Sequence, residues 1–389
     1  MSEWKKVKLG DITRIKTGKL DSNAAVPNGA YPFFTCDPTT LSIDKWAYDT
    51  EAILLAGNNA SGNYTAKYYK GKFNVYQRTY IIETLDPQFA SVRFMAYAMN
   101  QQLQLLKVMS SGSTTKFLTM KMLTQLSINL PSIETQNYIA TILSRYDSLI
   151  ENYQKQIKLL EEAAQRLYKE WFVDLRFPGH EHTKIVNGLP DGWEKRTIDD
   201  VTCKVTTGLN PRKNFVLGKG SNYYVTIKNM ADNTFFLDDR CDKVDNEALK
   251  KINKRSDLKI GDILFSGIGT IGRVALVDIP TNNWNVSESV FTLRVNDIVT
   301  KELLYLILLS PDMQNYCQSN AHGAAQKGIR MADLKAYSFN LPPFGLVQKF
   351  TSLVTPTIKK VSSIRNQIRL LTEARDRLLP KLMSGEINV

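Results

Sequence analysis

The sequence of 389 residues is poor in the side chains that most often bind metals or form disulfides. It has three histidines and four cysteines, and no two cysteines form a C-x-x-C pair. Neither a zinc site nor a disulfide framework is predicted, and such a chain is typical of a reducing compartment. His180 and His182 lie close together, but no cysteine or third histidine is near them. We therefore interpret them as part of a solvated linker around Pro178-Gly179.

Membrane segments and catalytic motifs are missing as well. The longest purely apolar run, about Leu303 to Leu309, is much shorter than a membrane span. Met1-Ser2-Glu3-Trp4 begins no signal peptide, so we expect a cytoplasmic protein. No G-x-x-x-x-G-K-[ST] phosphate loop occurs. Gly267 to Gly272 matches the dinucleotide fingerprint by letter, but Arg273 to Val277 continues as a strand and not as the helix that such a loop opens. We therefore predict that this chain is not itself an enzyme.

What the sequence has instead is an internal repeat. A shift of 211 positions, or 210 upstream, aligns long blocks of the two halves. The aligned blocks include Pro131 with Pro342, Gly112 with Gly323, Lys116 with Lys327, Gln156–Ala163 with Gln367–Ala374, and Ile53–Gly62 with Ile263–Gly272. A repeat this long indicates a tandem duplication, and the length of the chain also predicts at least two domains.

The charge is unevenly distributed along the chain. Lys+Arg number 50 against 38 Asp+Glu, which gives a formal net charge of +12 and a pI near 9.3. No acid occurs from Ala52 to Ile82, where basic residues alternate with tyrosine and phenylalanine, or from Val201 to Met230. A basic excess of this size also serves solubility, but one acid-free basic stretch per half favours two nucleic-acid surfaces.

Each half ends in an amphipathic helical pattern. From Ile139 to Trp171, and again from Phe350 to Leu382, apolar residues recur in alternating steps of four and three, which is a heptad seam. Only Thr357 and Arg375 interrupt the second seam. Antiparallel pairing of the two helices is favoured because it relates the halves by a pseudo-two-fold axis; the alternative is two separate helices, each packed on its own domain. The expected seam residues are Ile150, Tyr153, Ile157, Leu160, Leu167, Val361, Ile364, Ile368, Leu371 and Leu378.

The rest of each half reads as short strands with some helix. Predicted strands are Ile263–Phe265, Val274–Val277 and Val290–Val295, followed by a helix at about Lys301–Leu309. An alternating strand stopped by proline precedes each long helix, at Leu126–Pro131 and Tyr337–Pro342.

These features together resemble the specificity subunit of type I restriction-modification enzymes, and the resemblance runs from end to end. Its most specific marks are Gly261–Ser266 followed by Gly269–Arg273, Trp171–Asp174 after the first helix, and the tail Leu378–Ile387. In that family, two target-recognition domains are joined by two helices that pair antiparallel. Each domain reads one half of a bipartite DNA sequence, and the helices hold methyltransferase subunits and set the gap between the half-sites.

The resemblance implies an α+β fold with two pseudo-symmetric, β-rich target-recognition domains joined by two long antiparallel coiled-coil helices. The expected parts are recognition domain 1 at 1–133, the central helix at 134–175, recognition domain 2 at 176–344 with a linker at 176–192, and the C-terminal helix at 345–389. The implied partners are double-stranded DNA, two methyltransferase subunits and, through that core, restriction subunits, with no membrane. No cofactor is expected on this chain, because S-adenosylmethionine, ATP and Mg²⁺ belong to the partner subunits.

Each recognition domain is expected to contribute its own DNA surface. Lysines mostly meet phosphates, whereas arginine, asparagine and glutamine also read bases. The expected DNA-binding residues are Asn58, Asn59, Asn63, Tyr64, Lys67, Arg78, Thr114, Lys116, Arg212, Lys213, Lys228, Arg273, Gln326, Lys327 and Arg330. The alternatives are an autonomous DNA-modifying enzyme, which the missing motifs disfavour, and a coiled-coil scaffold without DNA recognition, which the acid-free stretches disfavour.

If the helix pair sets the gap, seven residues inserted between Gln154 and Lys155 keep the seam in register and move one recognition domain by about 10 Å, or roughly three base pairs. We expect methylome sequencing of cells with this variant to show a gap longer by a few base pairs and unchanged half-sites. An altered half-site with an unchanged gap would contradict the prediction.

Overall fold

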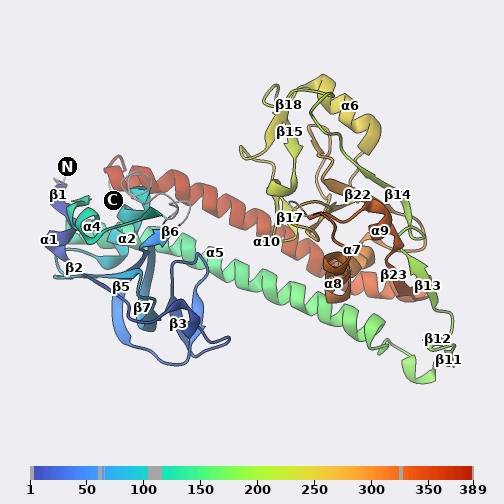
Figure 1. The fold of residues 1–389 in the computed structure, drawn as a ribbon, viewed down its shortest axis with the longest axis horizontal. Helices are drawn as coiled ribbons and strands as arrows, with labels where there is room; N and C mark the ends of the chain where they lie inside the picture. The colour runs from blue at the N-terminus through green and yellow to red at the C-terminus, as the bar shows by residue number, and fades with distance from the viewer. Residues whose placement is uncertain (1–3, 60–63, 65, 104–115, 324–326, 388–389) are drawn as a thin grey trace. The chain divides into compact units, whose positions relative to one another are not determined.

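The computed structural model of the chain divides into two compact units. It describes residues 4–59, 64, 66–103, 116–323 and 327–387. Unit 1 comprises Met1–Asn152 and Ile368–Val389, and unit 2 comprises Tyr153–Gln367. The two long helices, α5 (Ile133–Tyr168) and α10 (Phe344–Ser384), each contribute residues to both units (Figure 1). Each unit therefore combines a globular part with a stretch of both helices.

Unit 1 is built on one six-stranded sheet. Its elements are β1 (Lys5–Lys8), α1 (Leu9–Ile12), β2 (Thr13–Thr17), η1 (Ser22–Ala24), β3 (Tyr31–Phe34), β4 (Leu41–Ile43), β5 (Tyr48–Ala56), β6 (Asn58–Asn59), β7 (Ala66–Val75), β8 (Thr79–Thr84), α2 (Val92–Gln101), β9 (Lys116–Phe117), α4 (Met120–Gln125) and β10 (Ser127–Leu130). The sheet order is β2-β8-β5-β7-β3-β4, and only β3 and β7 run parallel. Helix α2 packs on β5 and β7, where Phe94 and Met95 are fully buried (Figure 1).

Unit 2 repeats this plan with shorter strands. Its elements are η2, a π-helical turn (Lys169–Val173), η3 (His180–His182), β11 (Ile185–Val186), β12 (Leu189–Pro190), β13 (Glu194–Thr197), β14 (Thr202–Thr207), β15 (Asn222–Val225), η4 (Ile227–Asn229), β16 (Met230–Ala231), β17 (Thr234–Phe235), β18 (Asp242–Val244), α6 (Asn246–Ser256), β19 (Ile263–Ser266), β20 (Val274–Leu276), β21 (Trp284–Val286), β22 (Val290–Val295), α7 (Lys301–Leu309), α8 (Pro311–Ser319), α9 (Met331–Ala336) and β23 (Ser338–Leu341). Its main sheets have the orders β14-β22-β19-β20 and β18-β15-β21.

The internal repeat of the sequence is confirmed in the hydrogen bonds of the two units. The order β2-β8-β5-β7 in unit 1 matches β14-β22-β19-β20 in unit 2. Asn74 Oδ1 accepts a hydrogen bond from Val75 N at 2.9 Å, and Asn285 Oδ1, 211 residues later, accepts one from Val286 N at 2.8 Å. In both units this residue pair lies beside a parallel strand, β3 or β15. The two halves therefore share a backbone plan as well as a sequence pattern.

The predicted local elements are largely confirmed. The strands expected around Ile263, Val274 and Val290 are β19, β20 and β22, and the helix expected at about Lys301–Leu309 is α7. The proline-stopped strands are β10 and β23. One detail of the first seam was wrong: the α-helix ends at Tyr168 and continues as a π-helical turn, so that its last residues leave the heptad spacing.

Antiparallel pairing of the long helices is confirmed inside each unit. In unit 1, Ile139 and Leu143, near the start of α5, share a core with Leu382, near the end of α10. In unit 2, Phe172, just after α5, packs edge-on against Phe350, near the start of α10, with ring centroids 4.6 Å apart. All ten expected seam residues are buried or partly buried. The helices are thus part of each globular core and do not pack as separate surface helices.

The polar interruption of the second seam has a partner in unit 1. Arg375 Nη1 donates to Asp147 Oδ1 at 2.7 Å, and the Tyr97 hydroxyl donates a short hydrogen bond to Asp147 Oδ2. Burial raises the pKa of the Tyr97 phenol, and the adjacent carboxylate raises it further. One carboxylate therefore links α2, α5 and α10.

We expect Asp147→Ala to destabilise unit 1 by about 1–2 kcal/mol, because it leaves two partly buried donors without their acceptor. Hydrogen–deuterium exchange of the α2 amides measures the loss. The matched control is Lys70→Ala, which removes an exposed ion pair with Glu51 and should leave exchange unchanged. If the α2 amides exchange at the same rate in Asp147→Ala as in the wild type, the hydrogen bonds of Asp147 to Arg375 and Tyr97 do not contribute to the stability of unit 1.

Candidate DNA interface

Most of the described DNA-binding candidates of unit 1 lie at one end of its sheet, where β5 ends and β8 begins. Gly57 N donates to Arg78 O at 2.9 Å, and Gly57 O accepts from Leu118 N at 2.8 Å. A Cβ atom at Gly57 would lie 2.5 Å from Arg78 O, so only glycine permits this close approach. We call these two hydrogen bonds through one glycine the glycine clamp.

The glycine clamp brings four predicted residues of unit 1 together. In the antiparallel pair of β6 with β9, Asn59 lies opposite Lys116, and Asn58 lies opposite Phe117. Arg78 is exposed at the start of β8, next to the same clamp. The structure therefore gathers Asn58, Asn59, Lys116 and Arg78 at one edge.

Two other predicted residues of unit 1 are engaged inside the fold. Lys67 Nζ donates to Thr40 Oγ1 at 3.1 Å and to Asp37 O at 3.3 Å. Partial burial lowers the pKa of the Lys67 amine, and the Asp37 carboxylate opposes this shift. Tyr64 is buried. The predicted residues Asn63 and Thr114 lie outside the described residues.

The glycine clamp recurs in unit 2 with the same atoms. Gly267 N donates to Ser289 O at 2.9 Å, and Gly267 O accepts from Ile329 N at 2.8 Å. Ser289 and Ile329 stand 211 residues after their counterparts in unit 1. Lys327 lies beside this clamp, because its carbonyl accepts from Gly269 N at 2.7 Å. Lys116 and Lys327 thus occupy equivalent backbone positions.

The other described candidates of unit 2 lie on loops, and one of these loops is hydrogen-bonded to the residue before the clamp. Arg212 and Lys213 are exposed in the loop after β14. Asn210 in the same loop donates to Glu288 Oε1 at 2.8 Å, and Glu288 directly precedes the clamp residue Ser289. Arg330 is exposed just before α9 and close to Lys327 in sequence. The predicted residue Gln326 lies outside the described residues.

Arg273 has a positioning role within unit 2. Its Nη1 atom donates to Ile227 O at 2.9 Å and makes a shorter hydrogen bond to Met230 O. These carbonyls flank the turn η4, which carries the exposed Lys228. The guanidinium is therefore engaged in holding the loop that presents Lys228.

One surface residue at this edge was missed by the sequence reasoning. Phe117 directly follows Lys116 and is 43% exposed. The available signal was an aromatic residue at the position where the second half has Gly328.

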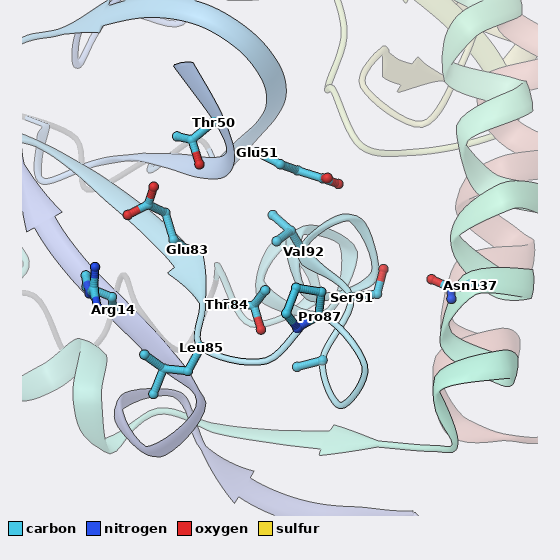
Figure 2. A pocket seen from close by; sticks show the side chains of 11 residues that line it. Arg14, Thr50, Glu51, Glu83, Thr84, Leu85, Pro87, Ser91, Val92 and Asn137 are labelled. Carbon is cyan, nitrogen blue, oxygen red and sulfur yellow. The ribbon is translucent and has the colours of Figure 1, made fainter. Parts of the chain in front are cut away.

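A cavity of about 450 Å³ lies at the opposite end of the unit 1 sheet. Figure 2 shows its lining, with Glu51 and Glu83 on neighbouring strands and Asn137 on α5. Glu83 pairs with Lys16 at 2.8 Å, and Glu51 accepts from the Tyr68 hydroxyl at 2.8 Å. Arg14 also lines this cavity, and Glu51 is paired with Lys70, so the charges of the lining are largely balanced.

Among the described residues, no group of three or more histidine, cysteine, aspartate or glutamate side chains is placed to hold a metal ion. In the same part of the chain, no helix combines the length and the apolar character that a membrane span requires.

We expect Arg273→Ala to increase hydrogen–deuterium exchange at residues 227–230, because two backbone carbonyls lose their donor. The matched control is Arg212→Ala, which removes an exposed arginine of the same unit and should leave exchange at 227–230 unchanged. Equal exchange in both variants would show that Arg273 does not hold the turn.

The chain matches the family described as the type I restriction modification DNA specificity domain over residues 1–162 and 190–369. It is 32% identical over 234 residues to the EcoDI specificity subunit of Escherichia coli, a match that covers 54% of this chain and 51% of that one. It is 30% identical over 294 residues to the MjaIX specificity subunit of Methanocaldococcus jannaschii, covering 73% of this chain and 66% of that one. The matches to these two relatives thus cover between half and two thirds of their length.

Other similarities extend over the whole chain. The HindI specificity subunit of Haemophilus influenzae is 23% identical over the full length of both chains. The crystal structure of a type I restriction-modification S subunit from M. genitalium superposes with a TM-score of 0.65 at 20% identity, covering 98% of this chain and 96% of that one. This structural likeness supports the fold, and the family match over both halves of the chain identifies it: the chain belongs to the type I restriction-modification DNA specificity family.

Proposed function

We propose that this chain is the DNA specificity subunit of a type I restriction-modification complex, in which the globular part of each unit reads one half of a bipartite DNA site. The observation that carries the proposal is the recurrence of the glycine clamp in both units, each time beside a lysine, Lys116 or Lys327. A duplicated surface of this kind fits a target with two separate halves. The names of the similar proteins support the same reading.

The candidates near the clamps and on the loops divide by chemistry. Lysine is a point charge that suits phosphate oxygens, whereas arginine and asparagine also make paired contacts with base edges. We assign Lys116, Lys213, Lys228 and Lys327 to phosphates, and Arg78, Arg212 and Arg330, together with Asn58 and Asn59, to phosphates or bases.

We propose that the outer faces of the long helices bind methyltransferase subunits, one against each unit. In unit 1, Tyr138 and Leu370 are exposed, and in unit 2 Leu159 is 65% exposed. Exposed apolar side chains on regular helices favour a protein partner. Tyr168, at the end of α5, is not part of this outer face: it is buried in the unit 2 core, where its ring packs against Phe172.

The chemistry of the complex is assigned to its partners. We propose that the methyltransferase and restriction subunits bind S-adenosylmethionine, ATP and Mg²⁺, and that this chain is non-catalytic and acts in the cytoplasm. Incubating the isolated chain with DNA, S-adenosylmethionine and Mg²⁺ separates this proposal from an autonomous DNA-modifying enzyme: methylation by the chain alone would exclude it.

The double change Lys116→Ala with Lys327→Ala tests the DNA surface. We expect the assembled complex to bind its target more weakly and the slope of log K against log salt to become less negative by about 2, because two phosphate contacts are lost. The methylated sequence should stay the same, since phosphates carry no sequence information directly. Binding titrations at several salt concentrations and methylome sequencing measure the two effects.

The matched control removes two exposed lysines that already form surface ion pairs, Lys70 with Glu51 and Lys250 with Glu247. The double change Lys70→Ala with Lys250→Ala alters the net charge by the same amount but should preserve the salt slope. If both double variants behave alike, the glycine clamps are not the DNA surface.

A further inference from the structure

Asn58 and Phe117 form a cross-strand pair at the unit 1 clamp. They lie directly opposite each other in the antiparallel pairing of β6 with β9, so their side chains leave the same face of this pair. The next residue, Leu118, is buried, and both of its backbone polar groups are bonded: its N–H to Gly57 O at 2.8 Å and its carbonyl to the Tyr80 hydroxyl at 2.8 Å. The exposed Phe117 ring therefore stands on a fixed backbone.

The polar member of this pair has an unused acceptor. Asn58 is partly exposed, and its Oδ1 atom is buried without a hydrogen-bond partner. Buried side-chain oxygens nearly always accept a hydrogen bond, so a ligand that brings an N–H donor here is favoured. The pair thus offers an unsatisfied amide beside an exposed apolar ring.

Unit 2 lacks both groups at the equivalent place. Ile268 and Gly328, 210 and 211 residues after Asn58 and Phe117, face each other in an antiparallel bridge. The glycine clamp is the same in the two units. The two units therefore differ here in side-chain chemistry, and in unit 2 Gly328 also exchanges two backbone hydrogen bonds of 2.8 Å with His322.

The surroundings favour duplex DNA over a protein as the occupant. The segment from Ala52 to Ile82 contains no acid, and Arg78 is exposed beside the clamp. An exposed arginine beside the exposed Phe117 ring is complementary to stacked bases between phosphates.

We infer that Asn58 and Phe117 together read one A·T base pair of the first half-site, an inference that rests on the proposed function. The amide of Asn58 matches adenine in the major groove, with Oδ1 accepting from N6 and Nδ2 donating to N7. The Phe117 ring packs against the C5 methyl group of the paired thymine. Ile268 has no amide and Gly328 has no ring, so they cannot make these two contacts. The equivalent position of the second half-site is therefore recognised by other contacts.

Modified duplexes test this pair in the assembled complex, once the methylated target is known. Each thymine of the first half-site is replaced singly by uracil, which removes only the methyl group, and each adenine by 7-deazaadenine, which removes only the N7 acceptor. At one base pair we expect uracil to weaken wild-type binding about threefold to fivefold and 7-deazaadenine to weaken it at least fivefold. Phe117→Ala should abolish the uracil effect and Asn58→Ala the 7-deazaadenine effect.

Phe89→Ala is the matched control, because Phe89 is 38% exposed but adjoins the cavity at the other end of the sheet. It should leave both effects intact. A modified base in the second half-site should change the binding of all three variants by the same factor as it changes the binding of the wild type. The wild-type measurements on modified DNA do not depend on the folding of any variant.

Two results would overturn the inference. If no thymine or adenine of the first half-site shows these effects while Lys116→Ala with Lys327→Ala still weakens binding, the pair does not read bases and the proposed function stands. If Phe117→Ala instead reduces the uptake of methyltransferase subunits and leaves DNA binding of the assembled complex unchanged, the ring is a protein contact. If neither the wild-type complex nor any variant distinguishes the target duplex from an unrelated duplex, the proposed function itself is refuted.

Discussion

The shared core of helix and sheet is the constraint on which the rest of the structure depends. In unit 1, Ile139 and Leu143 of α5 and Leu382 of α10 are buried in the same cluster as Phe94 and Met95, next to the sheet. In unit 2, the aromatic rings of Trp171 and Phe172 join Phe350 in the core of the globular part. Isolated helices of this kind are marginal in water, so each is stabilised by tertiary packing. The orientation of each globular part on its helices is thereby fixed by dense packing and not by a linker.

The two units share the backbone hydrogen bonds of the glycine clamp, but they carry different side chains beside it. The glycine clamp consists only of backbone hydrogen bonds, so neighbouring side chains can change without disturbing it. Asn58 and Phe117 in one unit correspond to Ile268 and Gly328 in the other. The side chains at these positions can therefore differ between the units while the backbone hydrogen bonds stay the same.

The sequence predicted much of the fold because its signals are local or repeated. The alternation of apolar residues predicted β22, and Pro342 predicted the end of β23. The heptad spacing of apolar residues predicted both long helices. The repeat also predicted that Lys116 and Lys327 are equivalent. The hydrogen-bond partners of side chains could not be predicted, because they join residues that are far apart in the sequence. Nothing near Arg375 in the sequence indicates Asp147, and nothing near Arg273 indicates the carbonyl of Ile227.

The composition of unit 1 has a consequence for the order in which the chain folds during synthesis. Unit 2 is one continuous segment, Tyr153–Gln367, whereas unit 1 combines the first 152 residues with Ile368–Val389. Leu382 and Met383 complete a core whose other members were synthesised more than 200 residues earlier. Until the last turns of α10 leave the ribosome, Ile139 and Leu143 lack the helix that covers them, although the whole of unit 2 has already been made. The synthesis of Leu382 and Met383 thus controls the completion of unit 1, and a chain that stops before them leaves the core around Ile139 and Leu143 incomplete.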